Sequence, residues 1–509
     1  MSNDNGSRAV WGSKLGFLMA AVGSAVGLGN IWRFSYMTYK NGGGAFLVPY
    51  IVALFAVGIP LVILEYTMGH KWRGSSPLAF AKVSKKWEAI GWWMPTVATV
   101  GIMLFYAVVI AWCMNYFVFS FNDLAWGTNS GDFFYKEFLE LSSGPMDLGG
   151  FRWSIVATTA LVWFICWFIC FKEVNHGIEK ACSIFMPLLF ILTLVLVAWS
   201  FTLPGASDGI KAYLTPDWKK VATIGPWIDA FGQIFFSLSL GFGIMITYAS
   251  YLPEKTNLYS SAIWTAVLNC SYSFVTGFAV FGTLGFMAHT KGVDISAVAK
   301  GGPGLAFVVY PEAISSLPQG KVAFGCVFFL TLIIAGLSSG VSLIEAFTCS
   351  IMDKFNWTRT KTTTTICVLG FLGSLVFTTR AGLYILDIVD HFINHYALVL
   401  GGLLECILVG WVWKACKARE HINEAGQTKM PVLWDFMIKF LAPMILVIIL
   451  QLALFNDFSK PYEGYSVGAL IFYGVQILIM TLLAAVLLSK QKWEKGKLDH
   501  KPEDETLLT

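Results

Sequence analysis

Long apolar stretches separated by short polar segments run through almost the whole chain. About 20 consecutive apolar residues cross the hydrocarbon core of a bilayer as one helix. The pattern therefore predicts an all-α integral membrane protein with twelve transmembrane helices. The predicted spans are 11–37, 43–70, 88–122, 154–171, 178–201, 226–252, 259–289, 321–353, 362–379, 383–415, 432–455 and 466–489.

The composition agrees with this pattern. Of the 509 residues, 56% are hydrophobic and 13% are charged, whereas a soluble globular protein carries about 25% charged residues. We expect one membrane domain without a separate soluble module. Its predicted parts are a cytoplasmic N-terminal segment (1–10), two five-helix units (11–201 and 226–415), a final helix pair (432–489) and a cytoplasmic tail (490–509).

The distribution of basic residues predicts the orientation. Lysine and arginine concentrate after the second and tenth predicted spans and after the last one. Cytoplasmic loops are enriched in these residues, so we expect a multi-pass protein of the cell membrane with both termini cytoplasmic. The net charge of +4 follows from this bias and does not indicate a nucleic-acid partner. The polar start of the chain and the length of the first span predict no cleavable signal peptide.

Cysteine usage and sequence motifs argue against several other classes. The ten cysteines fall in predicted spans or close to their inner ends, so no structural disulfide is expected. Cys166 and Cys170 are interpreted as packing residues rather than metal ligands. The sequence contains no Gly-x-x-x-x-Gly-Lys-[Ser/Thr] loop and no His-Glu-x-x-His motif, which argues against a nucleotide-driven pump or a metalloenzyme. The protein is not predicted to be an enzyme.

Two predicted spans are interrupted by glycine. Residues 23–30 of the first span read Gly-Ser-Ala-Val-Gly-Leu-Gly-Asn, and residues 237–243 of the sixth read Ser-Leu-Ser-Leu-Gly-Phe-Gly. Each glycine in a helix interior costs up to about 1 kcal/mol relative to alanine, so both segments are expected to unwind locally. The freed backbone groups cannot face lipid and must be buried in protein or line a cavity. Close helix packing through small residues is the alternative for either segment alone.

The two breaks occupy corresponding positions in the two five-helix units. Such a pair indicates an inverted repeat with a ligand site near the membrane midplane, a relation known from the transporter fold named below. The last two predicted spans fall outside this repeat.

Four segments carry a specific resemblance to a known family. They read Gly23-Ser-Ala-Val-Gly-Leu-Gly-Asn-Ile-Trp-Arg-Phe34, Asn41-Gly-Gly-Gly-Ala-Phe-Leu-Val-Pro-Tyr50, Gln233-Ile-Phe-Phe-Ser-Leu-Ser-Leu-Gly-Phe-Gly243 and Ala335-Gly-Leu-Ser-Ser339. From Arg8 through the tenth span, the chain resembles the neurotransmitter:sodium symporter family, which includes bacterial amino-acid transporters of the leucine-transporter fold. The resemblance implies twelve helices in a 5+5 inverted repeat with helices 1 and 6 broken. Spans 11 and 12 are similar to the family in hydropathy alone.

The resemblance implies two sodium sites at the first break. The first ion would bind the substrate carboxylate together with Ala25, Asn30, Ser237 and Asn269. The second ion would bind Gly23, Val26, Ala335, Ser338 and Ser339. Because the first ion shares the carboxylate, sodium and substrate would each raise the affinity of the other. Ordinary interhelical hydrogen bonding is the alternative reading of the two serines.

The resemblance also implies the substrate class. The substrate carboxylate would meet the amides of Leu28 and Gly29 at a half-helix N-terminus, which favours an anion, beside the Tyr106 hydroxyl. Gly27 stands where monoamine-carrying relatives have an aspartate, so we expect a substrate that brings its own carboxylate, a small or medium neutral amino acid. The remaining substrate residues would be Ser24, Ala25, Ile102, Phe236, Ser239, Phe242, Ser339 and Leu343.

A chloride site is expected from the seventh span. Chloride-independent bacterial relatives carry a glutamate four residues after the span 7 asparagine, but here Asn269 is followed at that spacing by Ser273. Two sodium ions beside a zwitterion would leave buried positive charge, which is costly without compensation. By resemblance, the anion would bind Tyr50, Gln233, Ser237, Asn269 and Ser273. A counter-transported proton or one fewer sodium ion is the alternative.

Ionisable residues within membrane spans are expensive and are usually functional. Arg33 and Asp390 match the outer gate pair of the family. Arg8 and Asp353 match its inner gate pair, with Tyr251 beside them. Further matches are Glu65, which is expected to accept hydrogen bonds from the broken helices, and Glu405; Glu345 has no assigned role, and His391 and His395 are interpreted as polar vestibule residues.

Together these features predict a sodium- and chloride-coupled symporter that imports a neutral, zwitterionic amino acid by alternating access. A chloride-independent sodium symporter and a non-transporting amino-acid sensor of the same fold remain alternatives. A channel fits less well, because selectivity filters generally come from symmetric rings.

Overall fold

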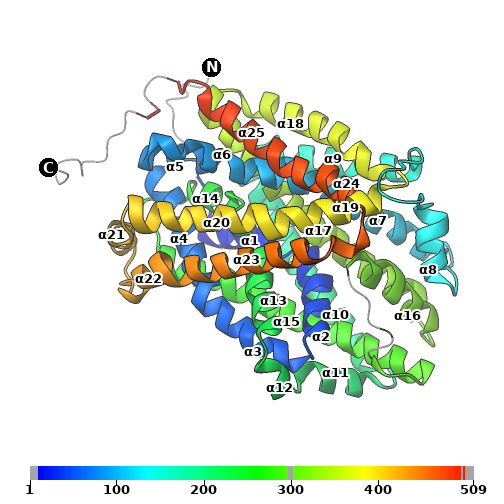
Figure 1. Cartoon of the computed structure of the whole chain (residues 1–509). Helices are drawn as coiled ribbons and strands as arrows, with labels where there is room; N and C mark the ends of the chain where they lie inside the picture. Colours follow the sequence, from blue (N-terminus) through cyan, green and yellow to red (C-terminus); the bar gives the residue numbers. More distant parts are fainter. Residues whose placement is uncertain (1–9, 296–297, 299–301, 495–496, 499–509) are drawn as a thin grey trace.

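The structure is a computed structural model that describes residues 10–295, 298, 302–494 and 497–498. This part of the chain is built from helices, with two isolated β-bridges, Gly43–Pro216 and Phe151–Thr379. Figure 1 shows the long helices running side by side through the molecule. The predicted all-α membrane architecture is confirmed at this level.

Among the described residues, ten helices are long and apolar enough to cross a membrane. They span Gly44–Trp72, Lys85–Phe121, Trp153–Cys170, Asn175–Phe201, Leu258–Lys291, Lys321–Phe355, Arg359–Thr378, Gly382–Val412, Leu433–Gly464 and Val467–Lys490. Their α-helical parts are α3 (Gly44–Ala53), α4 (Ile59–Trp72), α6 (Glu88–Thr96), α7 (Leu104–Phe121), α9 (Trp153–Cys170), α10 (Lys180–Phe201), α15 (Leu258–Lys291), α17 (Lys321–Phe355), α18 (Arg359–Ser374), α19 (Gly382–Phe392), α20 (Leu398–Ile407), α22 (Leu433–Phe436), α23 (Ala442–Ser459), α24 (Val467–Ala469) and α25 (Gln476–Lys490).

The two glycine-rich spans are broken, as expected. In the first, α1 (Lys14–Ala25) and the helix Gly29–Lys40, which ends in α2 (Phe34–Lys40), meet at 60°. In the sixth, α13 (Ile224–Ser237) and α14 (Ile244–Ala249) are separated by residues 238–243. Length and composition therefore account for ten crossings, or eleven with the bent pair. The twelfth crossing is a prediction that rests on α13 and α14.

Short helices connect the spans. They are α5 (Ser76–Val83), α8 (Ser130–Asp132), α11 (Ala206–Leu214), α12 (Trp218–Val221), α16 (Tyr310–Ser316) and α21 (Ala415–Ala425).

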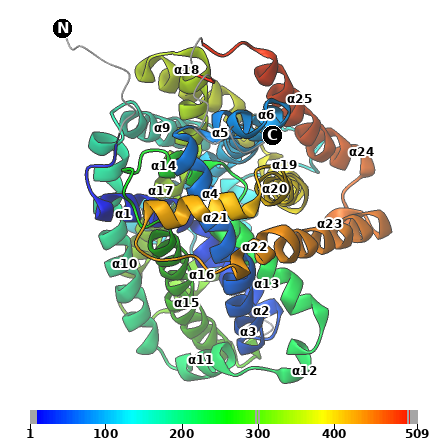
Figure 2. The same ribbon diagram turned by 90° about the vertical axis from the view of Figure 1, so that its left-hand side faces the viewer.

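The broken helix α1 lies at the centre of the bundle. It packs against α10, α14, α15 and α17, and its residues from Ala20 to Ala25 are buried. Figure 2 shows α23 and α25 at the periphery, on the side away from α1 and α10. The surface of these two outer helices is largely apolar and exposed, which suits contact with lipid.

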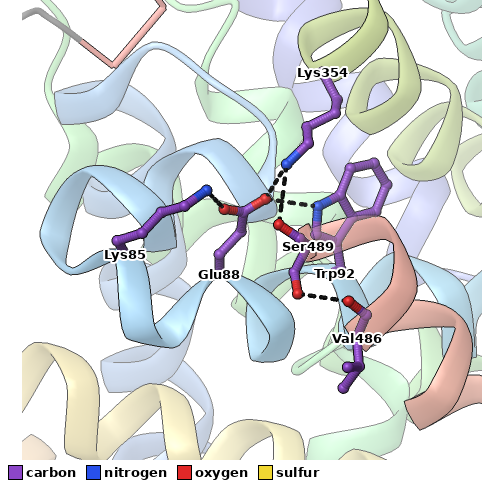
Figure 3. Close-up of polar contacts among 6 residues, drawn as sticks. All are labelled: Lys85, Glu88, Trp92, Lys354, Val486 and Ser489. Atoms are coloured by element: carbon purple, nitrogen blue, oxygen red, sulfur yellow. Dashed lines mark hydrogen bonds and ion pairs between the residues drawn. The ribbon is translucent and has the colours of Figure 1, made fainter. Parts of the chain in front are cut away.

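A buried ion pair ties the end of α17 to the start of α6, beside the end of α25. Lys354 donates to Glu88 and to the carbonyl oxygen of Ser489 (3.4 Å), and Lys85 also binds Glu88 (Figure 3). The Lys354 and Glu88 side chains are 0% and 1% exposed. The Lys354 ammonium lies 4.4 Å from the centre of the Trp493 ring. Trp493, just after α25, therefore packs against α17, the helix that carries several predicted site residues.

Candidate functional site

The two helix breaks face one another across a hydrogen-bonded contact. The amide nitrogen of Asn30, just after the first break, donates to Ser237 Oγ (2.9 Å), just before the second. At the first break, Val26 is extended (φ −78°, ψ 101°), and this ends α1. This side-chain contact thus brings the two predicted breaks to one place.

The second break depends on left-handed backbone conformations. Ser239, Gly241 and Gly243 have φ values of 54°, 78° and 72°, a region that glycine adopts without a steric penalty. The Gly241 amide donates to Glu65 Oε1 (2.8 Å). The expectation that Glu65 accepts a hydrogen bond from a broken helix is confirmed for this segment. A buried amide freed by unwinding needs such an acceptor.

A cavity of about 860 Å³ opens between the two breaks. All the predicted substrate residues line it: Ser24, Ala25, Leu28, Gly29, Ile102, Tyr106, Phe236, Ser239, Phe242, Ser339 and Leu343. It continues past Arg33 and Asp390 to the aromatic residues Tyr462 and Tyr465. One continuous space therefore connects the region of the breaks with the loop between α23 and α24.

Gly27 leaves space at the centre of this cavity. A Cβ atom at this position would lie 2.7 Å from Ser339 Oγ and 2.9 Å from the Tyr106 hydroxyl. The Leu28 amide donates to the same hydroxyl at 3.3 Å. The structure thus brings together a small residue, an amide donor and a phenol where the resemblance implies the substrate carboxylate.

Three of the residues predicted for the first sodium ion, Asn30, Ser237 and Asn269, form a compact oxygen-rich cluster with Ser273. Three oxygens lie near Asn30 Nδ2, namely Ser237 Oγ at 2.9 Å, Asn269 Oδ1 at 2.8 Å and Ser273 Oγ at 2.8 Å. An amide nitrogen has two hydrogens, so three close acceptors exceed what it can satisfy. Ala25 lines the adjacent cavity.

The residues predicted for the second ion lie along the contact of α1 with α17. Ser339 Oγ donates to the Val26 carbonyl (3.3 Å), and Ser338 Oγ donates to the Ala335 carbonyl (3.0 Å). A Cβ on Gly23 would meet Met186 and Cys182 of α10. Val26 and Ser339 are therefore in contact, whereas the small size of Gly23 serves the packing against α10.

Four of the five predicted chloride residues lie close together, and the fifth, Gln233, binds a residue outside this group. Ser237, Asn269 and Ser273 share the Asn30 cluster, and the buried Tyr50 hydroxyl lies near Cys270 and Ser273. Among the described residues, the Tyr50 hydroxyl makes no hydrogen bond of normal geometry, although Cys270 and Ser273 lie beside it, and a buried donor of this kind calls for an explanation. Gln233 instead faces the outer gate, because its Oε1 accepts a bond from Arg33 (2.9 Å).

The predicted outer gate residues line the cavity without forming an ion pair within the described part of the chain. Arg33 binds Gln233, and its guanidinium lies 4.6 Å from the centre of the Phe236 ring. Asp390 accepts a bond from Asn394 (2.8 Å). Arg33 therefore lies against the Phe236 ring, and both residues line the cavity.

At the opposite end, Arg8 lies outside the described residues. Asp353 accepts a bond from the Ser75 amide (2.8 Å). The Tyr251 hydroxyl donates to Glu345 (2.9 Å), which is also bound by Arg359 (3.0 and 2.5 Å). Trp11 is buried there, with its indole nitrogen 2.8 Å from the Tyr248 carbonyl.

Sequence reasoning missed Ser342 and the partners of Glu345 and His391. Glu345, which had no assigned role, is a partner of the predicted gate residue Tyr251. His391, interpreted as a vestibule residue, lines the cavity, where it contacts Asp457 (2.7 Å) and stacks on Tyr462. Ser342 lines the cavity and contacts Ser24. A sequence signal existed for Ser342, because it follows Ser339 by three residues and so lies on the same helix face.

The helical bundle, the paired breaks and the enclosed polar site together describe a membrane transporter. The model of the sodium:neurotransmitter symporter family matches residues 8–131 and 127–493. The chain is also 45% identical over 489 residues to a protein of Methanocaldococcus jannaschii named an uncharacterized sodium-dependent transporter, covering 96% of this chain and 99% of that protein. The chain therefore belongs to the sodium:neurotransmitter symporter family, whose members are sodium-coupled transporters and not enzymes.

Proposed function

We propose that this protein is a sodium- and chloride-coupled symporter that carries a small or medium neutral amino acid into the cell by alternating access. The proposal rests on one observation, namely that residues of both helix breaks line the same cavity. Oxygen-rich clusters lie on two sides of that cavity, at Asn30 and at Ser339. A cation at either cluster would therefore lie beside a substrate bound at Gly27.

An amino acid suits the cavity better than an amine does. The space at Gly27 is bordered by the Leu28 amide and the Tyr106 hydroxyl, both of which can donate to a carboxylate. An aspartate at this position would supply a negative charge, but glycine supplies none. The side-chain end of the cavity combines Ile102, Phe242 and other apolar groups with serine hydroxyls, which suits an uncharged side chain.

Chloride dependence is supported by two features, one in the seventh predicted span and one in the second. Ser273 cannot carry the compensating charge that a glutamate would supply. The buried Tyr50 hydroxyl of the second span makes no hydrogen bond of normal geometry among the described residues, and it lies near Ser273. An anion between these hydroxyls would use that donor and offset part of the sodium charge.

The proposed topology has twelve crossings in a 5+5 inverted repeat, with both termini in the cytoplasm. Arg33 and Asp390 would then form the outer gate and Asp353 part of the inner gate. With two sodium ions, one chloride and a zwitterion, one net positive charge enters per cycle. A tenfold sodium gradient supplies about 1.4 kcal/mol per ion, and 100 mV supplies about 2.3 kcal/mol per charge. The sum, about 5 kcal/mol, concentrates a substrate roughly several thousand-fold when chloride is balanced.

The test is uptake of neutral amino acids into proteoliposomes under an inward sodium gradient, with chloride or gluconate as the anion. Accumulation above equilibrium that requires both ions is the expected result. Equal uptake in gluconate would contradict the chloride site and leave a sodium symporter. Saturable binding without accumulation would contradict transport and favour a sensor.

A further inference from the structure

Ser342 makes the shortest polar contact between α1 and α17 close to the first break. Its hydroxyl accepts a hydrogen bond from Ser24 Oγ (2.8 Å) and donates to the Ser339 carbonyl (2.7 Å). Both serine side chains are buried, at 3% exposure for Ser24 and 0% for Ser342. Ser342 thus donates its single hydroxyl hydrogen within α17, and its oxygen accepts the hydrogen bond from Ser24 of α1.

A second contact between the two helices lies next to the first. Ser339 Oγ donates to the Val26 carbonyl at 3.3 Å, which is long for a hydroxyl donor, since such bonds normally measure about 2.5–3.0 Å. The bond between Ser24 and Ser342 is therefore the stronger polar link. It also lies immediately before the break, because α1 ends at Ala25.

We propose that Ser342 is a positioning residue for the second sodium ion, because its bond to Ser24 sets the register of α1 against α17. This inference rests on the proposed function, in which the Val26 carbonyl and the Ser339 hydroxyl are ligands of that ion. The two ligands come from different helices, so their separation depends on what holds the helices together. Binding sites lose affinity when ligands shift by about 0.5 Å.

Ser342 is not itself assigned as a ligand of the ion. Its hydrogen points to a backbone carbonyl and its oxygen accepts from Ser24, so the hydroxyl is occupied on both sides. Ser342 also lines the cavity, and a direct contact with the substrate side chain is the competing role. The experiment must therefore separate an effect on sodium from an effect on the amino acid.

The experiment uses the purified full-length protein and Ser342→Ala. Sodium is titrated at constant ionic strength without amino acid, and thermal stabilisation is the readout. Without amino acid the first site lacks its proposed carboxylate ligand, so the titration reports mainly on the second. Loss of one buried hydrogen bond, about 1 kcal/mol, corresponds to a rise of about fivefold in the sodium concentration for half-maximal stabilisation.

Three further variants complete the design. Ser24→Ala removes the same bond from the other helix and is expected to give the same shift, and the double variant no further shift. Ser350→Ala is the matched control, because Ser350 lies on the same helix, is fully buried and donates to the Ala346 carbonyl (2.7 Å). It is expected to keep the wild-type sodium dependence.

Two outcomes would overturn the inference. An unchanged sodium midpoint in Ser342→Ala, with a changed amino-acid KM at saturating sodium, would make Ser342 a specificity residue. Additive shifts in the double variant would show that the two serines act separately. A wild-type protein that sodium does not stabilise would instead overturn the proposed sodium site itself, and the role of Ser342 with it.

Discussion

Replacement of Gly27 by alanine is expected to abolish most substrate binding while the protein still folds. The added Cβ would lie 2.7 Å from Ser339 Oγ and 2.9 Å from the Tyr106 hydroxyl. Both distances are shorter than carbon and oxygen tolerate without movement. The side chains that would have to move are the same ones that the proposed function assigns to the carboxylate and to a sodium ion.

The size of the effect follows from two terms. Inserting a methyl group into a well-packed site costs about 1–3 kcal/mol. Displacing Tyr106 also loses its contact with the Leu28 amide, worth about 1 kcal/mol. The total of about 2–4 kcal/mol corresponds to a loss of affinity of roughly 30- to 1,000-fold.

The assay is sodium-dependent uptake in proteoliposomes, together with thermal unfolding of the purified protein. Gly232→Ala is the matched control, because a Cβ at this position in α13 would meet nothing within 4 Å. The control is expected to transport normally. Wild-type KM and rate in Gly27→Ala would refute the placement of the substrate at this glycine.

Three further perturbations test other parts of the molecule. Ser273→Glu is expected to make uptake independent of chloride, since the new carboxylate supplies the missing negative charge; uptake that still needs chloride would argue against the anion site. Lys354→Ala removes one cation from the buried carboxylate of Glu88 and is expected to destabilise the protein by about 3 kcal/mol. The measurement is the unfolding temperature, which should be lower than in the control Lys361→Ala, whose lysine lies over the Trp357 ring. His421 in α21 contacts His70 at 2.9 Å, and burial followed by the positive charge of its neighbours lowers its pKa to about 3. Protonation therefore favours the unfolded state, so stability should fall by up to about 1.4 kcal/mol between pH 7.5 and 5.5, and His421→Asn should flatten this dependence.

Much of the fold could be predicted because the signals are local. Each long apolar stretch determines a helix by itself, since lipid leaves the backbone no alternative to internal hydrogen bonding. The breaks could be predicted for the same reason, because clustered glycines weaken a helix whatever its packing neighbours are. The sixth span shows the limit of this reasoning. The apolar pattern predicts one span over 226–252, but in the structure its two halves, Ile224–Ser237 and Ile244–Ala249, are separated by six residues, so neither helix is long enough to count as a crossing.

The candidate site could be predicted where a family motif fixed the residues, and the structure gathers the substrate residues around one cavity. The polar partners between them could not be predicted. Ser24 and Ser342 are 318 residues apart in sequence, and no periodicity links them. Glu345 likewise had no partner that the sequence could identify. In the structure, Arg359 at the start of α18 binds it.

The sequence by itself thus determined which segments form long apolar helices, where two of the predicted spans break and which residue types line the breaks. Only the tertiary structure decided which hydroxyls and amides meet across α1, α13 and α17, and that Arg33 binds Gln233 rather than pairing with Asp390. The physical reason is the range of the forces involved. Helix formation in lipid follows from about 20 neighbouring residues, whereas a hydrogen bond between two helices depends on sub-ångström packing of segments hundreds of residues apart.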